Sequence, residues 1–323
     1  MSNGRRLSQA RPYAQKMIDV RSISRRFGSL TALDQVTFNV QPGEIVALLG
    51  PNGAGKTTAS RIIAGILAPT DGDVVVDGIS VRSDPTAVRR RSGFVTDQPA
   101  LYDRMPLRAY LDFFCRLYSV KDPVRRVNEL ALLLGLADRL DARLGTFSRG
   151  MKQKVAIARG LVHDPPVLLL DEPATALDPE TARMLRTFIV SLRERHRAIL
   201  LCTHDLDEAQ RIADRVVVVY KGRVARTGTT DELRAAERPS YLVTFVGESE
   251  SARAAFAGAG VPAEVARANG HPGLRFTPDD PAITNPRALR ALLDAGVTVL
   301  TLTREDRSLE DAYFSIVAQA KDG

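Results

Sequence analysis

Cysteine is scarce in this sequence, whose 323 residues include only Cys115 and Cys202. Neither cysteine has neighbours at the spacing of metal ligands, so nothing indicates a cysteine-bound metal. Two isolated cysteines also do not make the disulfide framework that holds small secreted domains together. The cysteine content therefore fits a reducing, cytosolic compartment.

Long hydrophobic runs are missing as well. No segment approaches the roughly 18 apolar residues that a membrane-spanning helix needs. The first sixteen residues are polar and carry four basic side chains, without the apolar centre of a secretion signal, so we expect a flexible arm over residues 1–16. Any role at a membrane would therefore require a separate membrane-spanning polypeptide.

The charge is unbalanced toward the positive side, with a formal net charge of +7. Such a balance raises the alternatives of nucleic acid, anionic lipid or a phosphate ligand as the partner. No tract of basic residues interleaved with aromatics occurs, and the run of arginines at 89–91 is too short to decide. We expect no nucleic-acid partner and interpret the charge as an arginine-rich surface that accommodates phosphate ligands.

Apolar runs alternate with helical patterns from residue 18 to about residue 235. Continuous apolar runs typical of strands buried on both faces indicate a parallel sheet of an α/β fold; they lie at 45–49, 93–96, 167–171, 199–203 and 216–220. About residues 99–163 look helical throughout, which predicts an inserted helical subdomain. Short strands at 17–24, 36–40 and 73–76 indicate a separate antiparallel β layer.

The composition shifts near residues 237–240, which predicts a second domain. We expect one domain over 17–236 and a smaller α+β accessory domain over 240–323. The smaller part shows the order β-α-β-β-α-β followed by a last helix, which is the ferredoxin-like pattern. The phosphate-binding pattern described next does not recur there.

The stretch 50–58 matches the pattern G-x-x-x-x-G-K-[ST], in which a backbone loop wraps a polyphosphate. It follows an apolar strand and precedes a helical segment, as the pattern requires. Glycines let backbone N–H groups approach the phosphates, the lysine reaches the β- and γ-phosphates, and the hydroxyl of the next residue coordinates Mg²⁺. The predicted nucleotide-binding residues are Gly50, Pro51, Asn52, Gly53, Ala54, Gly55, Lys56, Thr57 and Thr58.

Two carboxylates end the apolar strand at 167–171. Asp171 is predicted to hold Mg²⁺, directly or through water. Glu172, one step beyond the strand, is predicted to polarise the attacking water as a general base. With the loop at 50–58, this arrangement predicts a site that binds a nucleotide with Mg²⁺ and hydrolyses it.

Ser148, Arg149 and Gly150 open a predicted helix, and at this point the chain resembles the ATP-binding-cassette (ABC) ATPases. In that family this loop reaches the γ-phosphate bound by the opposing subunit. The resemblance therefore implies a head-to-tail dimer, of two copies or with a similar ATPase, that encloses two MgATP. The chain departs from the commonest form, L-S-G-G-Q, at Phe147, Arg149 and Met151.

Four further positions match motifs of the same family. Gln98 resembles the glutamine that binds Mg²⁺ and the attacking water, and Asp178 resembles the aspartate at the dimer seam. His204 resembles the histidine that contacts the γ-phosphate, and Phe27 resembles the aromatic residue that stacks on adenine. The resemblance covers residues 17 to about 233 and implies a RecA-like P-loop NTPase core.

The family resemblance also implies a separate membrane-spanning permease, which the ATPase would drive from the cytoplasmic face of the membrane. Residues 308–314 look like the L-E-D-x-F ending of ATPases that serve exporters of drugs and lipids, so we expect an exporter. Two alternatives remain open. One is a soluble ABC ATPase that acts on nucleic acid or ribosomes, and the other is an importer ATPase with a regulatory C-terminal domain.

Overall fold

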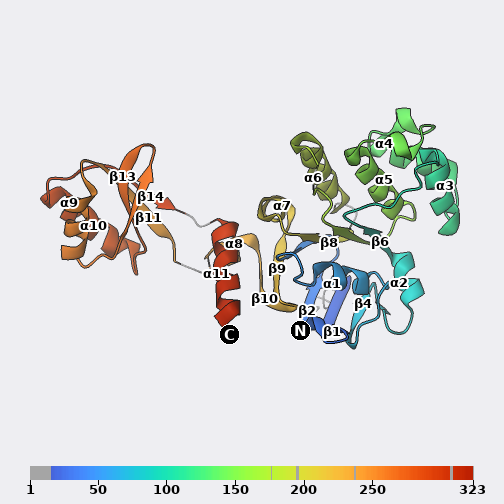
Figure 1. Ribbon diagram of the computed structural model, residues 1–323, viewed down its shortest axis with the longest axis horizontal. Helices are drawn as coiled ribbons and strands as arrows, with labels where there is room; N and C mark the ends of the chain where they lie inside the picture. Colours follow the sequence, from blue (N-terminus) through green and yellow to red (C-terminus); the bar gives the residue numbers. More distant parts are fainter. Residues whose placement is uncertain (1–15, 176, 194–195, 236–237, 306–307, 323) are drawn as a thin grey trace, which may run out of the picture. The chain divides into compact units, whose positions relative to one another are not determined.

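The computed structural model describes residues 16–175, 177–193, 196–235, 238–305 and 308–322 (Figure 1). The chain divides into two compact units, Met1–Gly228 and Thr229–Gly323. All of the expected N-terminal arm except its last residue lies outside the described residues.

A six-stranded sheet forms the centre of unit 1, in the order β10-β9-β3-β8-β7-β6. Its strands are β3 (Ile45–Leu49), β6 (Ser92–Val95), β7 (Val167–Asp171), β8 (Ala198–Thr203), β9 (Arg215–Tyr220) and β10 (Arg223–Gly228). Five of them are parallel, which confirms the predicted sheet, and β10 is antiparallel to β9. The sequence did not indicate β10, because half of its residues are polar and only Gly228 is buried.

Helices of the insertion and of the segments after β7 cover one face of this sheet, whereas α1 (Lys56–Ile63) and an antiparallel layer lie on the other (Figure 1). Successive residues of β7 alternate between the faces: Leu168 and Leu170 pack with the helical segments, whereas Val167 and Leu169 pack toward α1. All five residues of β7 are buried, which explains why the four residues before Asp171 form a continuous apolar run.

The predicted antiparallel layer is a four-stranded sheet in the order β2-β1-β4-β5. It consists of β1 (Ile18–Phe27), β2 (Leu30–Val40), β4 (Asp71–Val76) and β5 (Ile79–Ser80). The short helix α2 (Pro85–Arg91) follows, with Asp84 as its N-cap. Both β1 and β2 are longer than the sequence indicated, and their pairing contains register shifts.

The insertion between β6 and β7 is helical, as the sequence predicts. It contains α3 (Leu107–Leu117), α4 (Pro123–Leu133), two short 3₁₀ turns (Ala137–Arg139 and Leu144–Thr146) and α5 (Arg149–Leu161). After β7 come α6 (Pro179–Arg193) and α7 (Leu206–Ile212). In the described parts of the chain, none of the helices has the length and apolar content to cross a membrane.

Unit 2 begins with α8 (Thr230–Ala235), which packs against the last helix, α11 (Leu309–Asp322). Unit 2 therefore starts before residue 236, where the sequence suggested the first domain would end. Its other elements are β11 (Ser240–Val246), α9 (Ser249–Gly258), β12 (Glu264–Ala268), β13 (His271–Phe276), α10 (Pro281–Asp294) and β14 (Thr298–Glu305). The sheet has the order β12-β13-β11-β14, and each neighbouring pair is antiparallel.

Two glycines let α5 lie directly on β6. A methyl group added at Gly93 would come 2.2 Å from the carbonyl oxygen of Gly160, which is backbone and cannot move aside as a side chain could. The absence of a side chain at Gly93 thus fixes how closely the helical insertion approaches the sheet.

We expect Gly93→Ala to destabilise unit 1 by about 1–3 kcal/mol, since it overpacks this contact. The measurement is the midpoint of thermal unfolding. Gly258→Ala is the control, because a methyl group at that helical position meets no atom within 4 Å. An unchanged midpoint for Gly93→Ala would mean that α5 and β6 can separate without cost.

Candidate nucleotide-binding site

The predicted phosphate loop and both predicted carboxylates lie at the carboxyl end of the six-stranded sheet. Residues 50–55 follow β3, Glu172 follows β7 and His204 follows β8, and these three strands are neighbours. Ligands of open parallel sheets bind at this end, because the loops after adjacent strands converge there. The topology therefore gathers residues that lie far apart in the sequence.

Lys56 is the central cation of this cluster, and only 6% of it is exposed. Its ammonium donates hydrogen bonds to the carbonyl oxygens of Gly50, at 2.7 Å, and Pro51, at 3.2 Å. The same nitrogen lies 3.6 Å from Oε1 of Glu172. Gly55 precedes it with φ +106°, and a side chain there would come within 2.6 Å of the Ala32 carbonyl oxygen.

Asp171 ends β7 and is almost fully buried. Its Oδ1 atom has no hydrogen-bond partner among the described residues. Burial raises the pKa of this carboxyl, and the nearby Thr57 hydroxyl opposes that shift. A buried carboxylate oxygen without a partner beside a hydroxyl is a donor set that suits a hard cation such as Mg²⁺.

Glu172 is held from several sides. Its backbone lies in the left-handed region, with φ 52°, and its N–H donates to the Cys202 carbonyl oxygen at 2.8 Å. Nδ1 of His204 lies 2.9 Å from both carboxylate oxygens, and the Thr175 hydroxyl donates to Oε2 at 3.0 Å. This backbone conformation costs a non-glycine residue about 1–3 kcal/mol, so the surrounding contacts must hold Glu172 in it. The arrangement fixes a carboxylate that can accept a proton from water.

Several supporting residues were not singled out from the sequence. The Thr203 hydroxyl accepts from Asp205 N at 3.0 Å, and Asp205 caps α7 by accepting from Glu208 N at 3.1 Å. Glu208 is buried, which raises its pKa to about 7. Within α1, the buried Ser60 hydroxyl lies 2.9 Å from Cys202 Sγ in β8. The acidic residue Glu208, four positions after His204, is the sequence feature that could have drawn attention to these supporting residues.

The structure places Gln98 differently from the other predicted residues. Gln98 is exposed, and its carbonyl oxygen accepts from the Thr96 hydroxyl at 3.1 Å. Burial is the main cause of the raised pKa of Asp171, and the negative charges of Asp97, next to Gln98, and of Glu172 add to it. The loop after β6 therefore brings a second carboxylate, Asp97, near the buried one.

Ser148, Arg149 and Gly150 lie at the start of α5. The Ser148 hydroxyl caps the helix by accepting from Met151 N at 3.3 Å. Neither Ser148 nor Arg149 hydrogen-bonds to residues 50–58 within the described part of the chain. Asp178 likewise caps α6, accepting from Thr181 N at 2.9 Å, and this backbone hydrogen bond lowers its pKa. Ala176, part of the same predicted motif, lies outside the described residues.

Phe27 ends β1 and is 45% exposed. The guanidinium of Arg25 lies 4.6 Å from the centre of its ring. An exposed aromatic face of this kind is available for stacking, as the sequence interpretation requires of an adenine contact.

Comparison with known proteins identifies the family. The ABC transporter family profile matches residues 33–175. The ABC transporter ATP-binding protein NatA of Bacillus subtilis is 38% identical over 70% of this chain and 95% of NatA. YxlF of the same organism, an uncharacterized ABC transporter ATP-binding protein, is 31% identical over 93% of this chain and 99% of its own length. The sulfate/thiosulfate import ATP-binding protein CysA of Caulobacter vibrioides is 39% identical over 72% of this chain and 70% of CysA.

A solved structure shows the same fold. The dimeric ATP-binding cassette MJ0796, in a post-hydrolysis state with ADP and Pi, superimposes with a TM-score of 0.61 at 28% identity, covering 66% of this chain and 98% of that one. The phosphate loop, the carboxylates at the end of β7 and the similarity to these proteins all indicate the same family. The chain belongs to the ABC transporter family as an ATP-binding subunit, and it couples ATP hydrolysis to transport.

Proposed function

We propose that Glu172 is the general base of ATP hydrolysis. The observation that carries this proposal is its fixed position, because His204 contacts both carboxylate oxygens and Lys56 lies 3.6 Å from one of them. Lys56 would pair with the β- and γ-phosphates, and Glu172 would take a proton from the attacking water. His204 would keep the carboxylate oriented and contact the γ-phosphate.

We propose that Asp171 and Thr57 hold Mg²⁺. The described residues contain no cluster of three or more carboxylate, histidine or cysteine side chains that could bind a metal. An ion at this place would therefore take its other ligands from phosphate and water, as Mg²⁺ commonly does. When bound, Mg²⁺ neutralises charge on the transferred phosphoryl group. Asp97 and the predicted ligand Gln98 would act on this ion from the loop after β6.

We propose that two ATPase subunits enclose two ATP molecules head to tail, each completing the other's site with Ser148, Arg149, Gly150 and Asp178. Support comes from the hydrogen bonds of Ser148 and Asp178, which cap their own helices rather than reach residues 50–58. The dimeric MJ0796 cassette is a precedent for the assembly. The partner subunit would be a second copy or a similar ATPase.

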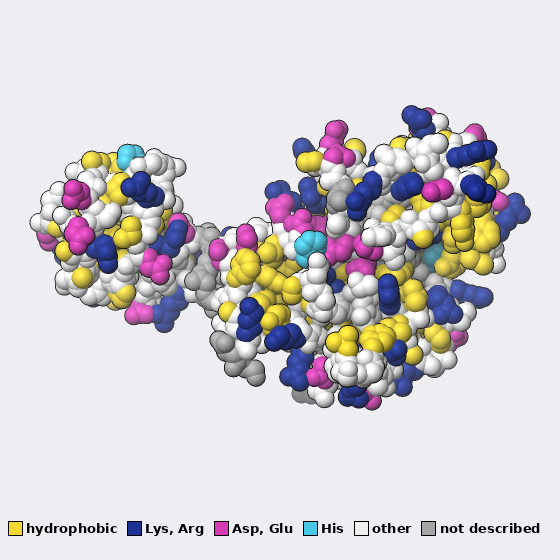
Figure 2. Space-filling model, viewed as in Figure 1, with side chains coloured by type: hydrophobic (Ala, Val, Ile, Leu, Met, Phe, Trp, Pro, Cys, Tyr) yellow, Lys and Arg dark blue, Asp and Glu magenta, His cyan; other side chains and the backbone are white. Residues whose placement is uncertain are grey.

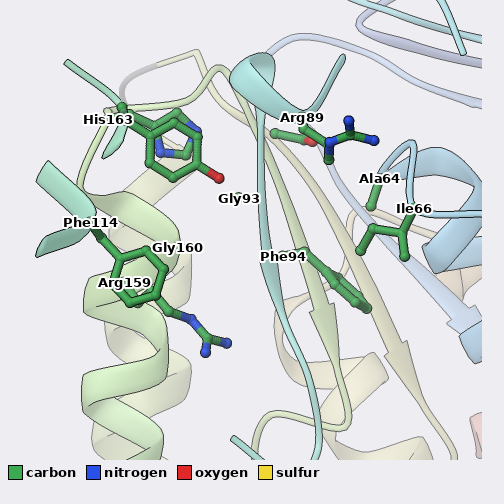
Figure 3. Close-up of a pocket in the computed structure, with 11 residues that line it drawn as sticks. Ala64, Ile66, Arg89, Gly93, Phe94, Phe114, Arg159, Gly160 and His163 are labelled. Carbon is green, nitrogen blue, oxygen red and sulfur yellow. The ribbon is translucent and has the colours of Figure 1, made fainter. Parts of the chain in front are cut away.

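We propose that a membrane-spanning permease docks at the cleft between β6, α3 and α5, on the cytoplasmic face of the membrane. Figure 3 shows Phe114, Arg159 and His163 on one side of this cavity, and Arg89, Ile66 and Phe94 on the other. Its volume is about 190 Å³. His163 stacks on Tyr118 at 4.0 Å between ring centres.

Exposed apolar side chains extend this docking surface. Phe113 and Leu117 on α3 are 47% and 63% exposed, and Figure 2 shows hydrophobic atoms gathered over this helix, with arginine and lysine side chains around them. A contiguous apolar patch with a polar rim is typical of a protein–protein contact. Because β6 leads directly into residues 97 and 98, movement at the nucleotide site would reach the permease here.

We propose that the transporter is an exporter, from the ending at 308–314, of which Leu309–Phe314 opens α11. The similarity to the importer subunit CysA keeps import as the second candidate. The strand order and two helices of unit 2 fit a ferredoxin-like accessory domain, β11-α9-β12-β13-α10-β14. The identity of the permease that copurifies from solubilised membranes, and of the compound it moves, separates export from import.

Asp171→Asn should raise the stability of the nucleotide-free protein and weaken its binding of Mg²⁺. The raised pKa means that ionised Asp171 costs stability above that pKa, and the cost disappears below its ordinary value of 3.8, where folded and unfolded chains are both protonated. Without nucleotide, the variant should melt at a higher temperature than the wild type at pH 8, with the difference shrinking toward pH 4. Its affinity for Mg²⁺ with ATP should fall by at least about tenfold.

The control for this comparison is Asp138→Asn, which changes a carboxylate that is 74% exposed and should shift neither quantity. A less stable Asp171→Asn protein at pH 8 would contradict the assignment of an unsatisfied buried carboxylate.

Glu172→Gln should keep ATP binding, trap a stable dimer and lower turnover by about 10²–10⁴-fold, because the amide cannot accept the proton. Steady-state phosphate release and size-exclusion chromatography with ATP are the measurements. Glu129→Gln on the surface of α4 is the matched control. Turnover like that of the wild type in Glu172→Gln would remove Glu172 from the base role.

Leu117→Glu should abolish copurification of the permease while leaving the ATPase activity of the isolated subunit unchanged. The substitution places a charge in the proposed apolar contact. Leu293→Glu in α10 is the control, because Leu293 is 62% exposed and Leu117 is 63% exposed. Normal permease recovery with Leu117→Glu would place the docking surface elsewhere.

A further inference from the structure

A second cavity in unit 1 shares no lining residue with the phosphate loop. It lies among the end of α4, the start of α5 and the start of α6, and has a volume of about 310 Å³. Its apolar lining includes Leu132, Leu133, Leu177, Met184, Leu185 and Phe188. The volume is at the lower end of the range for small-ligand sites, about 300–1,000 Å³.

The apolar lining is open to solvent. Leu132 is 74% exposed, Leu133 51% and Met184 48%, although all three surround one concave space. Water in contact with such a surface is displaced favourably by an apolar ligand. The cavity therefore has the character of a binding site for a hydrocarbon chain.

Two polar residues in the lining, Gln153 and Lys154, indicate which head group a ligand with a hydrocarbon chain would carry. Gln153 is only 5% exposed, and its Nε2 donor has no hydrogen-bond partner. A buried donor of this kind is costly to leave unpaired. Lys154, the next residue, also lines the cavity, and no ion pair to it occurs within the described residues. An amide donor and an ammonium group together match a carboxylate.

We propose that this cavity binds a single-chain amphiphile with a carboxylate head, that is, a free fatty acid. The alkyl chain lies among the exposed leucines and Met184. The carboxylate accepts a hydrogen bond from Gln153 Nε2 and pairs with the Lys154 ammonium.

The cavity adjoins the first turns of α5 and α6. Gly150 and Thr181 both line it, and a methyl group added at Gly150 would come 2.9 Å from Cγ2 of Thr181. A ligand in the cavity therefore sets the spacing between the loop at Ser148 and the capping residue Asp178. An effect on turnover rests on the proposed function of these residues at the dimer interface, whereas binding itself does not.

The test is titration calorimetry of the full chain with dodecanoate below its micelle concentration. We expect one molecule bound per chain, and at least tenfold weaker binding for Lys154→Gln and for Met184→Trp, which fills the cavity from a half-exposed position. Gln153→Leu should weaken binding similarly. Lys152→Gln is the matched control, because Lys152 lies on the same helix, pairs with Asp103 and does not line the cavity.

Equal affinity for dodecyltrimethylammonium, or unchanged affinity in both Lys154→Gln and Met184→Trp, would overturn the carboxylate site. Dodecanoate should also change the ATPase rate of the wild type but not of Met184→Trp. Binding without any change in rate would refute the coupling and keep the site. Failure of the proposed catalytic roles would appear separately, as normal turnover in Glu172→Gln.

Discussion

A buried ammonium must be surrounded by oxygen atoms, because removing an unpaired charge from water costs more free energy than the folded state of a protein gains overall. Lys56 meets this demand with two carbonyls of its own loop and with Glu172. The loop after β3 is thereby tied to the end of β7, and the contact of Glu172 with His204 extends the tie to the end of β8. Three loops, the first of which lies more than a hundred residues before the other two, thus form one electrostatic cluster at the edge of the sheet where the family binds ATP.

Much of the fold follows from the sequence because the central strands are buried on both faces. The residues predicted for β3 and β7 are those observed, since each is an uninterrupted apolar run. Elements without such a run were missed. Half of the residues of the edge strand β10 are polar, and α2 ends in three arginines, so neither element shows a periodic apolar pattern. Their positions depend on neighbouring elements, which local sequence does not reveal.

The site shows a similar division between residue type and geometry. Sequence spacing places Lys56, Asp171 and Glu172 correctly at strand ends, but it contains no sign of the left-handed backbone of Glu172. That conformation depends on a hydrogen bond to Cys202, thirty residues later. The exposed position of Gln98 depends on how the chain turns after β6. Buried Gln153 and partly exposed Lys154 match no recognisable sequence pattern, because the cavity that they line is made by three separate helices.

The two cysteines have a practical consequence. Cys115 lies within the helical insertion and Cys202 in the central sheet, and both are fully buried. Burial raises the pKa of Cys115 to about 11 and also raises that of Cys202. Neither thiol is accessible or ionised in the folded chain at neutral pH, so a thiol-specific reagent modifies each one only when its surroundings open. The helical insertion and the central sheet of unit 1 thus each contain one buried thiol. The two labelling rates measure how independently these two parts unfold.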